Sequence, residues 1–266
     1  MNLFDTFLLG VYGIFTLTYM AIITFTDIVT CGYFSRKLII EIFRFCSTMT
    51  HVFRRDIFLS NTTGIIPDMG DLIIPNHQSI WEMPIQWHIS TSQNRLIGCA
   101  FKKQMLKIPF FGYLLGRSGW PAISRTDAAA DIKTLSQYCG DPFYIYAEGT
   151  RYTDAGYLKA IQFGKDHDIQ VAKYTMIPKT TGAFNALRPG STQAIYIQTN
   201  VYCNADNTLS RDPFPKNSYI RWDRYLVSEI PSDNKGFQTW LRTKFLDMDT
   251  VFDNVLAGNV SNYVKI

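Results

Sequence analysis

The feature that most constrains this 266-residue chain is an uncharged apolar run near its N-terminus. No residue from Thr6 to Thr26 is charged, and the run lies between Asp5 and Asp27. As a helix it would extend about 30 Å, the thickness of the hydrocarbon core of a bilayer. A signal peptide would instead have a basic N-terminal region and a shorter apolar core, whereas Asp5 is acidic. We therefore predict a helix that spans the membrane or enters it as a re-entrant segment.

A second membrane-associated segment is predicted after the first. From Ser35 to Met49, apolar residues recur at helical spacing and charged residues take other positions. This pattern is typical of an amphipathic helix on the bilayer surface, and equally of a helix whose apolar face packs on a protein core. Basic residues gather after the first run, so the positive-inside tendency places the remaining chain on the cytoplasmic side. We assign residues 1–50 to N-terminal membrane-associated helices and residues 51–266 to one folded domain.

The composition supports contact with lipid. Hydrophobic residues make up 47% of the chain and charged residues 18%, whereas a soluble protein has about 25% charged residues. The net charge of +4 suits anionic headgroups or a phosphate-bearing substrate. Basic residues occur as short pairs, which does not favour binding of nucleic acid. Five widely spaced cysteines, without a C-x-x-C pair, argue against a disulfide framework or zinc site and favour a reducing compartment.

From about residue 70 short apolar runs alternate with longer helical patterns, which predicts an α/β domain with a single mixed sheet flanked by helices. No internal repeat or linker indicates a second soluble domain. The predicted strands are Asp71–Pro75, Arg95–Phe101, Trp120–Ser124, Phe143–Ala147, Thr192–Tyr202 and Tyr219–Val227. The predicted helices cover residues 82–90, 126–139, 157–168 and 234–257.

One of the four histidines is well placed for chemistry. His77 follows a predicted strand in a polar turn, and ligand sites in open α/β sheets form at the carboxyl ends of strands. Glu82 lies five residues further on, so its carboxylate could hold the imidazole in one tautomer, as a general base acting on a hydroxyl requires. On one continuous helix the two side chains would diverge by about 140°. We therefore place His77 in the turn before the helix.

Glu82 also has a structural interpretation. Ser79-x-x-Glu82 matches a capping box, in which the glutamate accepts hydrogen bonds from backbone N–H groups. Pro84 argues against a helix capped by Ser79, because proline at the fifth helical position would lose an intrahelical bond. A helix that begins near Met83 tolerates Pro84 in its first turn. These residues alone leave both catalysis and capping open for Glu82.

Three further segments bring polar side chains to the ends of apolar runs. The first ends at Arg125, the second is a buried strand that leads into Glu148–Arg151, and the third carries Pro178 and Lys179. Arginine offers a rigid fork that matches phosphate oxygens, and a glycine in the loop lets the backbone come close to a ligand. Two arginines at strand ends could clamp one phosphate, although each alone is more often a surface ion-pair partner.

Together these segments resemble the motif blocks of the glycerolipid acyltransferase family, which includes 1-acylglycerol-3-phosphate, lysocardiolipin and lysophosphatidylinositol acyltransferases. The similar segments are His77–Glu82 for H-x4-D, Gly119–Arg125 for the second block, Glu148–Arg151 for E-G-T-R, Ile177–Gly182 for the fourth block, Lys107–Tyr113 for K-x-P-F-F-G and Asn234–Phe252 near the end of the domain. The E-G-T-R and P-K-T-T-G segments look most like the eukaryotic-type branch.

Three positions depart from the family pattern. Glu82 stands where most members have aspartate, Ala147 replaces a usual proline, and Lys179 stands where arginine is common. A glutamate can make the same hydrogen bond with one more methylene group. We therefore expect the change at Glu82 to be tolerated.

The resemblance implies that residues 51–266 form an acyltransferase domain, which transfers a fatty acyl chain from acyl-CoA to the free hydroxyl of a lysophospholipid. The expected acceptor is 1-acyl-sn-glycerol-3-phosphate (lysophosphatidic acid). His77 would act as the base, without an acyl-enzyme. The sequence does not identify the donors to the oxyanion, for which backbone amides near the start of the following helix are reasonable candidates. The expected site residues are His77 and Glu82 for catalysis, and Arg125, Glu148, Gly149, Thr150, Arg151, Pro178 and Lys179 for substrate binding.

No metal or cofactor is expected beyond acyl-CoA as co-substrate, and the expected partners are the two substrates and a membrane, without nucleic acid. In a eukaryote the resemblance implies the endoplasmic reticulum or a related endomembrane. The alternatives are a remodelling enzyme that acts on lysocardiolipin or lysophosphatidylinositol, a non-catalytic lipid-binding relative, and a hydrolase in which His77 activates water. The acceptor, the acyl-chain length and the oligomeric state are not encoded in these motifs.

Overall fold

The structure is a computed structural model that describes residues 3–30, 40–42, 44–45, 48, 55–61, 63–79, 82–92, 96–138, 140–187, 192–211 and 215–266, and for residues 3–9 it describes the backbone alone. Most of the predicted amphipathic segment Ser35–Met49 lies outside these residues, and its described positions are helical. The assignment of residues 1–50 and 51–266 to two parts stays a prediction.

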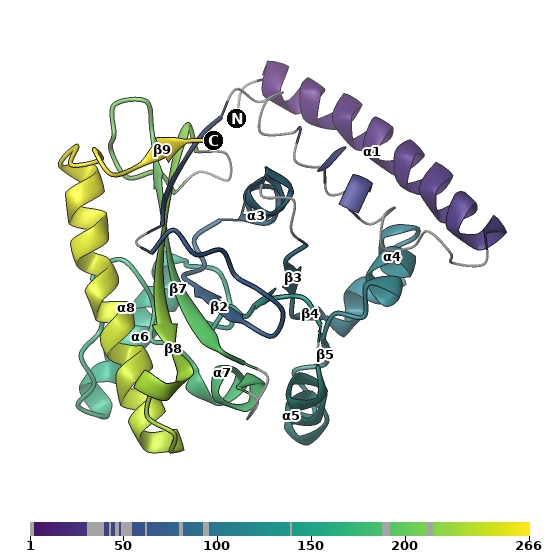
Figure 1. Cartoon of the computed structure of the whole chain (residues 1–266). Coiled ribbons are helices and arrows are strands. Elements are labelled where there is room, and N and C mark those ends of the chain that lie inside the picture. Colours follow the sequence, from purple (N-terminus) through teal and green to yellow (C-terminus); the bar gives the residue numbers. More distant parts are fainter. Residues whose placement is uncertain are drawn as a thin grey trace.

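A seven-stranded mixed sheet forms the centre of the fold, with the strand order β3-β6-β2-β7-β8-β1-β9 (Figure 1). Strands β3, β6, β2 and β7 run parallel, β8 is antiparallel to β7 and parallel to β1, and β9 is antiparallel to β1. The strands are β1 (Asp56–Asn61), β2 (Leu72–Pro75), β3 (Gly98–Cys99), β6 (Phe143–Tyr144), β7 (Ala194–Cys203), β8 (Asn217–Leu226) and β9 (Val264–Lys265). The prediction of an α/β domain built on a mixed sheet is confirmed, and a second, two-stranded sheet accompanies it.

Two details of the predicted strands are corrected. The run Arg95–Phe101 was expected to form one strand, but its described part divides between β3 and β4 (Phe101–Lys102). The run Trp120–Ser124 contributes only β5 (Ala122–Ile123), which pairs with β4 in a separate two-stranded sheet. The chain leaves the main sheet after β3, and its backbone N–H groups then pair with the segment before Arg125.

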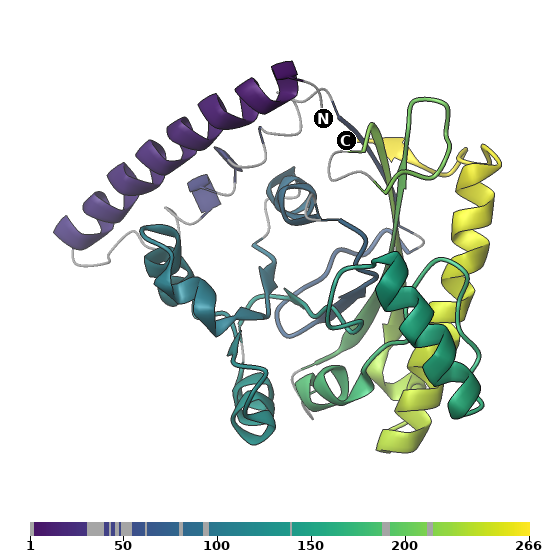
Figure 2. The same ribbon diagram turned by 180° about the vertical axis from the view of Figure 1, so that it is seen from behind.

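Helices cover both faces of the sheet, because side chains alternate between the faces along each strand. In β2, Leu72 and Ile74 pack in the same cluster as α8, whereas Ile73 packs in the cluster of α3. The helices are α1 (Leu3–Val29), α3 (Glu82–Ser92), α4 (Phe111–Ser118), α5 (Ala128–Gln137), α6 (Asp154–Asp166), α7 (Thr180–Ala186) and α8 (Asn234–Leu256), with short 3-10 turns at Lys103–Lys107 and Val227–Glu229. Figure 2 shows α1 far from α8, on the α3 side.

The predicted N-terminal helix is confirmed as α1. Its segment Gly10–Val29 has the length and apolar composition to cross a membrane. The buried carboxylate of Asp27 fixes its end, since it accepts a hydrogen bond from the Tyr113 hydroxyl at 2.9 Å and lies 3.3 Å from Nε of Arg117. Its exposed large apolar side chains are Ile14, Phe15, Leu17, Ile22, Phe25, Ile28 and Val29. An apolar face is therefore available for lipid.

Candidate active site

His77 and Glu82 form the pair that the sequence predicts. Nδ1 of His77 lies 2.5 Å from Oε2 of Glu82. The glutamate is buried, whereas 22% of the His77 side chain is exposed. With Nδ1 on the carboxylate, the imidazole has Nε2 left to receive a proton. The position at the carboxyl end of β2 is the one expected for a ligand site in such a sheet.

Glu82 also caps the turn before α3, so the same carboxylate contacts the imidazole and the turn. Its catalytic role stays a prediction. Its Oε1 accepts hydrogen bonds from the backbone N–H groups of Gln78 at 2.5 Å and Ser79 at 2.9 Å. Helix α3 begins at Glu82, which leaves Pro84 in the first turn. The amides of Gln78 and Ser79 are thus occupied by the carboxylate. These two amides are therefore not available for the oxyanion, for which amides near this helix start were candidates.

Glu148 stabilises the His77 turn through hydrogen bonds to the backbone. Its two oxygens accept hydrogen bonds from the backbone N–H groups of His77 at 2.7 Å and Met176 at 3.2 Å. Burial raises the pKa of Glu148 to about 8, and the charge of Glu82 also raises it. The two backbone hydrogen bonds lower the pKa, but by less. The carboxyl group therefore joins three segments that are far apart in the sequence. Its observed contacts are with the protein backbone.

The E-G-T-R loop and the P-K-T-T-G turn meet beside His77. The Tyr152 amide donates to the His77 carbonyl at 2.7 Å, and the Lys179 amide donates to the Ala147 carbonyl at 2.7 Å. Gly149 has a φ of +74°, and a Cβ there would lie 3.3 Å from Nζ of Lys179. The loop thus needs a glycine at this position both for its backbone conformation and for the lysine that covers it.

The remaining predicted substrate residues differ in exposure. Thr150 and Arg151 are exposed beside the Tyr152 contact, and Pro178 is buried at the turn before Lys179. Among the described residues, the Arg151 guanidinium makes no hydrogen bond or ion pair. It is therefore free to meet a ligand from the solvent side.

Arg125 lies on a different element. It follows β5 with a φ of +66°, and the backbone amides of Ser124 and Arg125 each donate to the Asp131 carboxylate at 2.7 Å. In the part of the chain that the structure describes, no hydrogen bond or ion pair joins Arg125 to His77 or to the E-G-T-R loop. The structure therefore connects three of the four predicted segments directly, and a role for Arg125 at the site stays a prediction.

A buried polar network, which the sequence did not predict, supports the His77 turn. Asn76 and Asn200 exchange hydrogen bonds, with the Asn200 amide 2.6 Å from Oδ1 of Asn76. Gln198 donates to Asn200 and accepts from the Trp222 indole, both at 2.6 Å. All ten residues of β7 are buried. Consecutive polar residues inside such an apolar strand are the signal that could have identified this network.

Tyr146 is a second feature that the motifs do not predict. Its ring lies 4.2 Å from the His77 ring, between centroids. Burial, followed by the neighbouring charge of Glu82, raises the pKa of the Tyr146 hydroxyl well above its usual range. The ring therefore packs against the imidazole as a neutral phenol and restricts its orientation.

The described residues provide neither a metal-binding cluster nor a reactive thiol. Among the described residues, no group of three or more His, Cys, Asp or Glu side chains is arranged to hold a metal ion. Burial raises the pKa of the thiols of Cys99 and Cys203 to about 12 and about 11. Neither is a thiolate at neutral pH, so neither is suited to nucleophilic catalysis.

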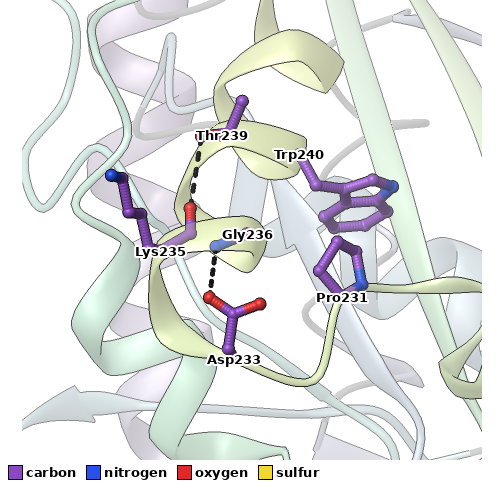
Figure 3. Close-up of a pocket in the computed structure, with 6 residues that line it drawn as sticks. All are labelled: Pro231, Asp233, Lys235, Gly236, Thr239 and Trp240. Atoms are coloured by element: carbon purple, nitrogen blue, oxygen red, sulfur yellow. Dashed lines mark hydrogen bonds between the residues drawn. The ribbon is translucent and has the colours of Figure 1, made fainter.

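A pocket on the surface lies at the other edge of the sheet (Figure 3). It is formed at the start of α8, after β8 has ended beside the first residues of β7. Its lining residues are Pro231, Asp233, Lys235, Gly236, Thr239 and Trp240. Because β2 runs parallel to β7, His77 at the carboxyl end of β2 lies at the opposite edge. This pocket is separate from the candidate active site.

Comparison with known proteins identifies one family. The model of the family described as Acyltransferase matches residues 57–202. Lysocardiolipin acyltransferase 1 of Gallus gallus is 24% identical over 68% of this chain and 53% of its own length. A probable 1-acyl-sn-glycerol-3-phosphate acyltransferase 5 of Arabidopsis thaliana is 23% identical over 70% and 54%. The chain thus spans about half the length of these two relatives.

A solved structure is also similar. The crystal structure of the 1-acyl-sn-glycerophosphate acyltransferase from Thermotoga maritima has a TM-score of 0.49 and 14% sequence identity, over 92% of this chain and 96% of that one.

Proposed function

This chain belongs to the glycerolipid acyltransferase family, and we propose that it transfers a fatty acyl chain from acyl-CoA to the free hydroxyl of a lysophospholipid. The observation that carries the proposal is the His77–Glu82 pair, with Nδ1 held at 2.5 Å and the imidazole partly exposed. A base fixed in one tautomer beside the surface is what attack by an alcohol requires. The names of the relatives, which include lysocardiolipin and 1-acyl-sn-glycerol-3-phosphate acyltransferases, support a lysophospholipid acceptor.

In the proposed reaction, Nε2 of His77 takes the proton of the acceptor hydroxyl as its oxygen attacks the thioester carbonyl. Glu82 keeps the proton of the neutral imidazole on Nδ1 and stabilises the imidazolium that forms. The bond between the carbonyl carbon and sulfur then breaks, and the His77 imidazolium gives the proton to the departing sulfur, so that coenzyme A leaves as the thiol. The described cysteines are poor nucleophiles, which favours direct transfer without an acyl-enzyme.

We assign the phosphate of the acceptor to the cations beside His77. The exposed Arg151 lies one residue from the Tyr152 amide that contacts His77, and Lys179 lies over Gly149 in the same loop. A guanidinium binds phosphate with two parallel hydrogen bonds, and an ammonium adds a point charge. Lysophosphatidic acid, which exposes a phosphate monoester, is the acceptor that we favour.

We also propose that the enzyme works on a membrane. The exposed apolar face of α1 supports insertion into lipid, and the anchoring of Asp27 on α4 fixes this helix to the rest of the protein. The positive-inside tendency favours a catalytic part on the cytoplasmic side. In a eukaryotic cell the endoplasmic reticulum or a related membrane would fit this arrangement.

A panel of acceptors tests the proposed function. Purified full-length protein in neutral detergent micelles is given labelled acyl-CoA with lysophosphatidic acid, monolysocardiolipin, lysophosphatidylinositol or no acceptor. We expect labelled phosphatidic acid and acceptor-dependent release of coenzyme A. Transfer to monolysocardiolipin instead would assign a remodelling enzyme. Labelled free fatty acid without an acceptor would indicate a hydrolase, and no product with any acceptor would indicate a lipid-binding relative.

A further inference from the structure

A cation outside the four motif segments lies beside the candidate active site. Arg211 follows β7, which runs parallel to β2, so both strands end at the same edge of the sheet. The intervening turn is ordered, because the Ser210 amide donates to the Tyr202 carbonyl at 2.7 Å and Leu209 forms an antiparallel bridge with Cys203. These contacts place Arg211 beside the carboxyl end of β7.

Tyr152 connects this cation to the catalytic turn. The Arg211 guanidinium carbon lies 3.8 Å from the centroid of the Tyr152 ring, a distance for a cation–π contact. The Tyr152 amide donates to the His77 carbonyl at 2.7 Å, and Tyr152 directly follows Arg151. Stacking covers one face of the guanidinium and leaves its N–H groups, which lie in the plane, available for a ligand.

No acidic side chain in the described part of the chain neutralises this cation directly. Among the described residues, none forms an ion pair or hydrogen bond with the Arg211 guanidinium. Glu148 and Asp154 are near enough to influence its charge, but burial has the larger effect and lowers the pKa of Arg211. Burial also raises the pKa of Glu148 to about 8, which reduces the negative charge that this group presents near Arg211. Arg211 is therefore an exposed cation that lies over the Tyr152 ring, and no carboxylate among the described residues pairs with it.

We propose that Arg211, stacked on Tyr152, binds a phosphate group of a substrate at the candidate active site, an inference that rests on the proposed function. A rigid guanidinium fork matches phosphate oxygens, and a position beside the His77 turn would hold the substrate where the transfer occurs. Two substrates carry phosphate: the lysophospholipid in its headgroup, and acyl-CoA in its nucleotide. Both present the same chemistry to Arg211, so separate titrations identify the source.

The test measures binding, which does not require turnover. Full-length wild-type protein, Arg211→Gln and Arg211→Lys are titrated in neutral micelles with lysophosphatidic acid and, separately, with coenzyme A. Monoacylglycerol, which lacks phosphate, is the matched ligand. The control variant is Lys165→Gln, which removes an exposed cation about 16 Å from Asp154 along α6. Circular dichroism and the thermal midpoint confirm that each variant is folded.

We expect Arg211→Gln to bind one of the two phosphate ligands roughly tenfold to a hundredfold more weakly, which is the effect of one charge-assisted hydrogen bond. Binding of monoacylglycerol should not change, and Lys165→Gln should match the wild type. Weaker lysophosphatidic acid binding assigns the headgroup, and weaker coenzyme A binding assigns the nucleotide. Arg211→Lys should bind the same phosphate ligand about threefold to tenfold more weakly, because lysine keeps the charge without the planar fork. If Arg211→Gln does not fold, the affinity of Arg211→Lys decides whether the inference holds.

Dissociation constants within twofold of wild type for both phosphate ligands would overturn the inference. So would wild-type protein that binds neither. The proposed function is judged separately by the transfer assay on the same preparations. Wild-type protein that binds phosphate through Arg211 but transfers no acyl chain would refute the function and leave this binding site standing.

Discussion

Replacement of Glu82 by glutamine tests the link between the hydrogen bonds of this residue and the proposed chemistry. Among the described residues, the carboxylate accepts three hydrogen bonds: the Gln78 and Ser79 amides on one oxygen, and Nδ1 of His77 on the other. A glutamine of nearly equal volume has one acceptor oxygen and one donor NH2 group. It therefore cannot reproduce all three contacts.

The two orientations of the glutamine amide have different costs. If its NH2 group faced the Gln78 and Ser79 amides, buried donors would face one another. Each donor left without an acceptor would cost about 1–3 kcal/mol of folding free energy. The favoured orientation keeps the oxygen on these amides and turns NH2 toward His77. Nδ1 must then accept, which places the imidazole proton on Nε2, the atom that has to receive the substrate proton.

We expect Glu82→Gln to reduce kcat by about 10⁴, the effect of the corresponding change in a serine protease triad, where the tautomer is also wrong. This corresponds to about 5.5 kcal/mol of activation free energy. The assay is transfer of labelled acyl groups from acyl-CoA to lysophosphatidic acid in micelles, with kcat and KM determined separately. The thermal midpoint should shift little, since the favoured orientation keeps the cap on the turn.

Glu82→Asp is the matched control, because it retains the negative charge and restores the residue that most family members carry. We expect a loss of less than about 10² in kcat, since a shorter side chain lengthens the contact but allows the correct tautomer. If Glu82→Gln kept its rate within tenfold of wild type while folded, the tautomer argument would be wrong and Glu82 would only cap α3.

Three further changes test the surrounding loop. Glu148→Gln should remove a pH dependence of the free energy of unfolding. The pKa of Glu148 is about 8 in the folded protein and 4.5 in the unfolded chain, so its contribution to stability is complete below pH 4.5 and is lost as the pH rises through 8. This contribution is at most about 5 kcal/mol. Thermal midpoints between pH 5 and 9 check this, and an equal slope in both proteins would contradict it. Gly149→Ala should cost roughly 1–2 kcal/mol of unfolding free energy in denaturant titrations, because its φ is +74°; an unchanged value would refute the strain. Arg151→Ala should raise KM for lysophosphatidic acid about tenfold or more with little change in kcat, and an unaltered KM would remove Arg151 from the phosphate site.

Strand β2, the start of α3 and the His77–Glu82 pair could be predicted because they depend on local sequence patterns. The buried apolar run before Asn76 predicted β2, and the position of Pro84 predicted that α3 begins after the His77 turn. The five-residue spacing then placed Glu82 within reach of His77, and the structure gives 2.5 Å. The family, the mixed sheet and the apolar N-terminal helix are likewise confirmed.

Other elements depend on tertiary contacts that no local pattern contains. Helix α7 is not among the predicted helices, since Thr180–Ala186 is short and includes a glycine, but Ala183 and Ala186 are buried in the cluster that contains α8. Strand β9 is two residues long and exists through its pairing with β1. Packing against these neighbours stabilises segments whose own propensity is weak.

The same reason explains what the motifs did not reveal around the site. Asn200 and Asn76 are 124 positions apart, and only the parallel pairing of β2 with β7 brings them together. Glu148 was predicted to contact substrate, but its neighbours in space are the His77 and Met176 amides. Arg211 belongs to no motif and reaches the site through the turn after β7. Contacts at this sequence distance follow from topology.

The most direct test of the account is the turnover of His77→Ala protein. Purified wild type and variant are compared in micelles with labelled acyl-CoA and lysophosphatidic acid, after circular dichroism and thermal unfolding have shown that both are folded. Loss of a general base should reduce transfer by about 10²–10⁴ and leave the binding of lysophosphatidic acid near the wild-type value. Full transfer by folded His77→Ala protein would contradict the assignment of His77 as the base.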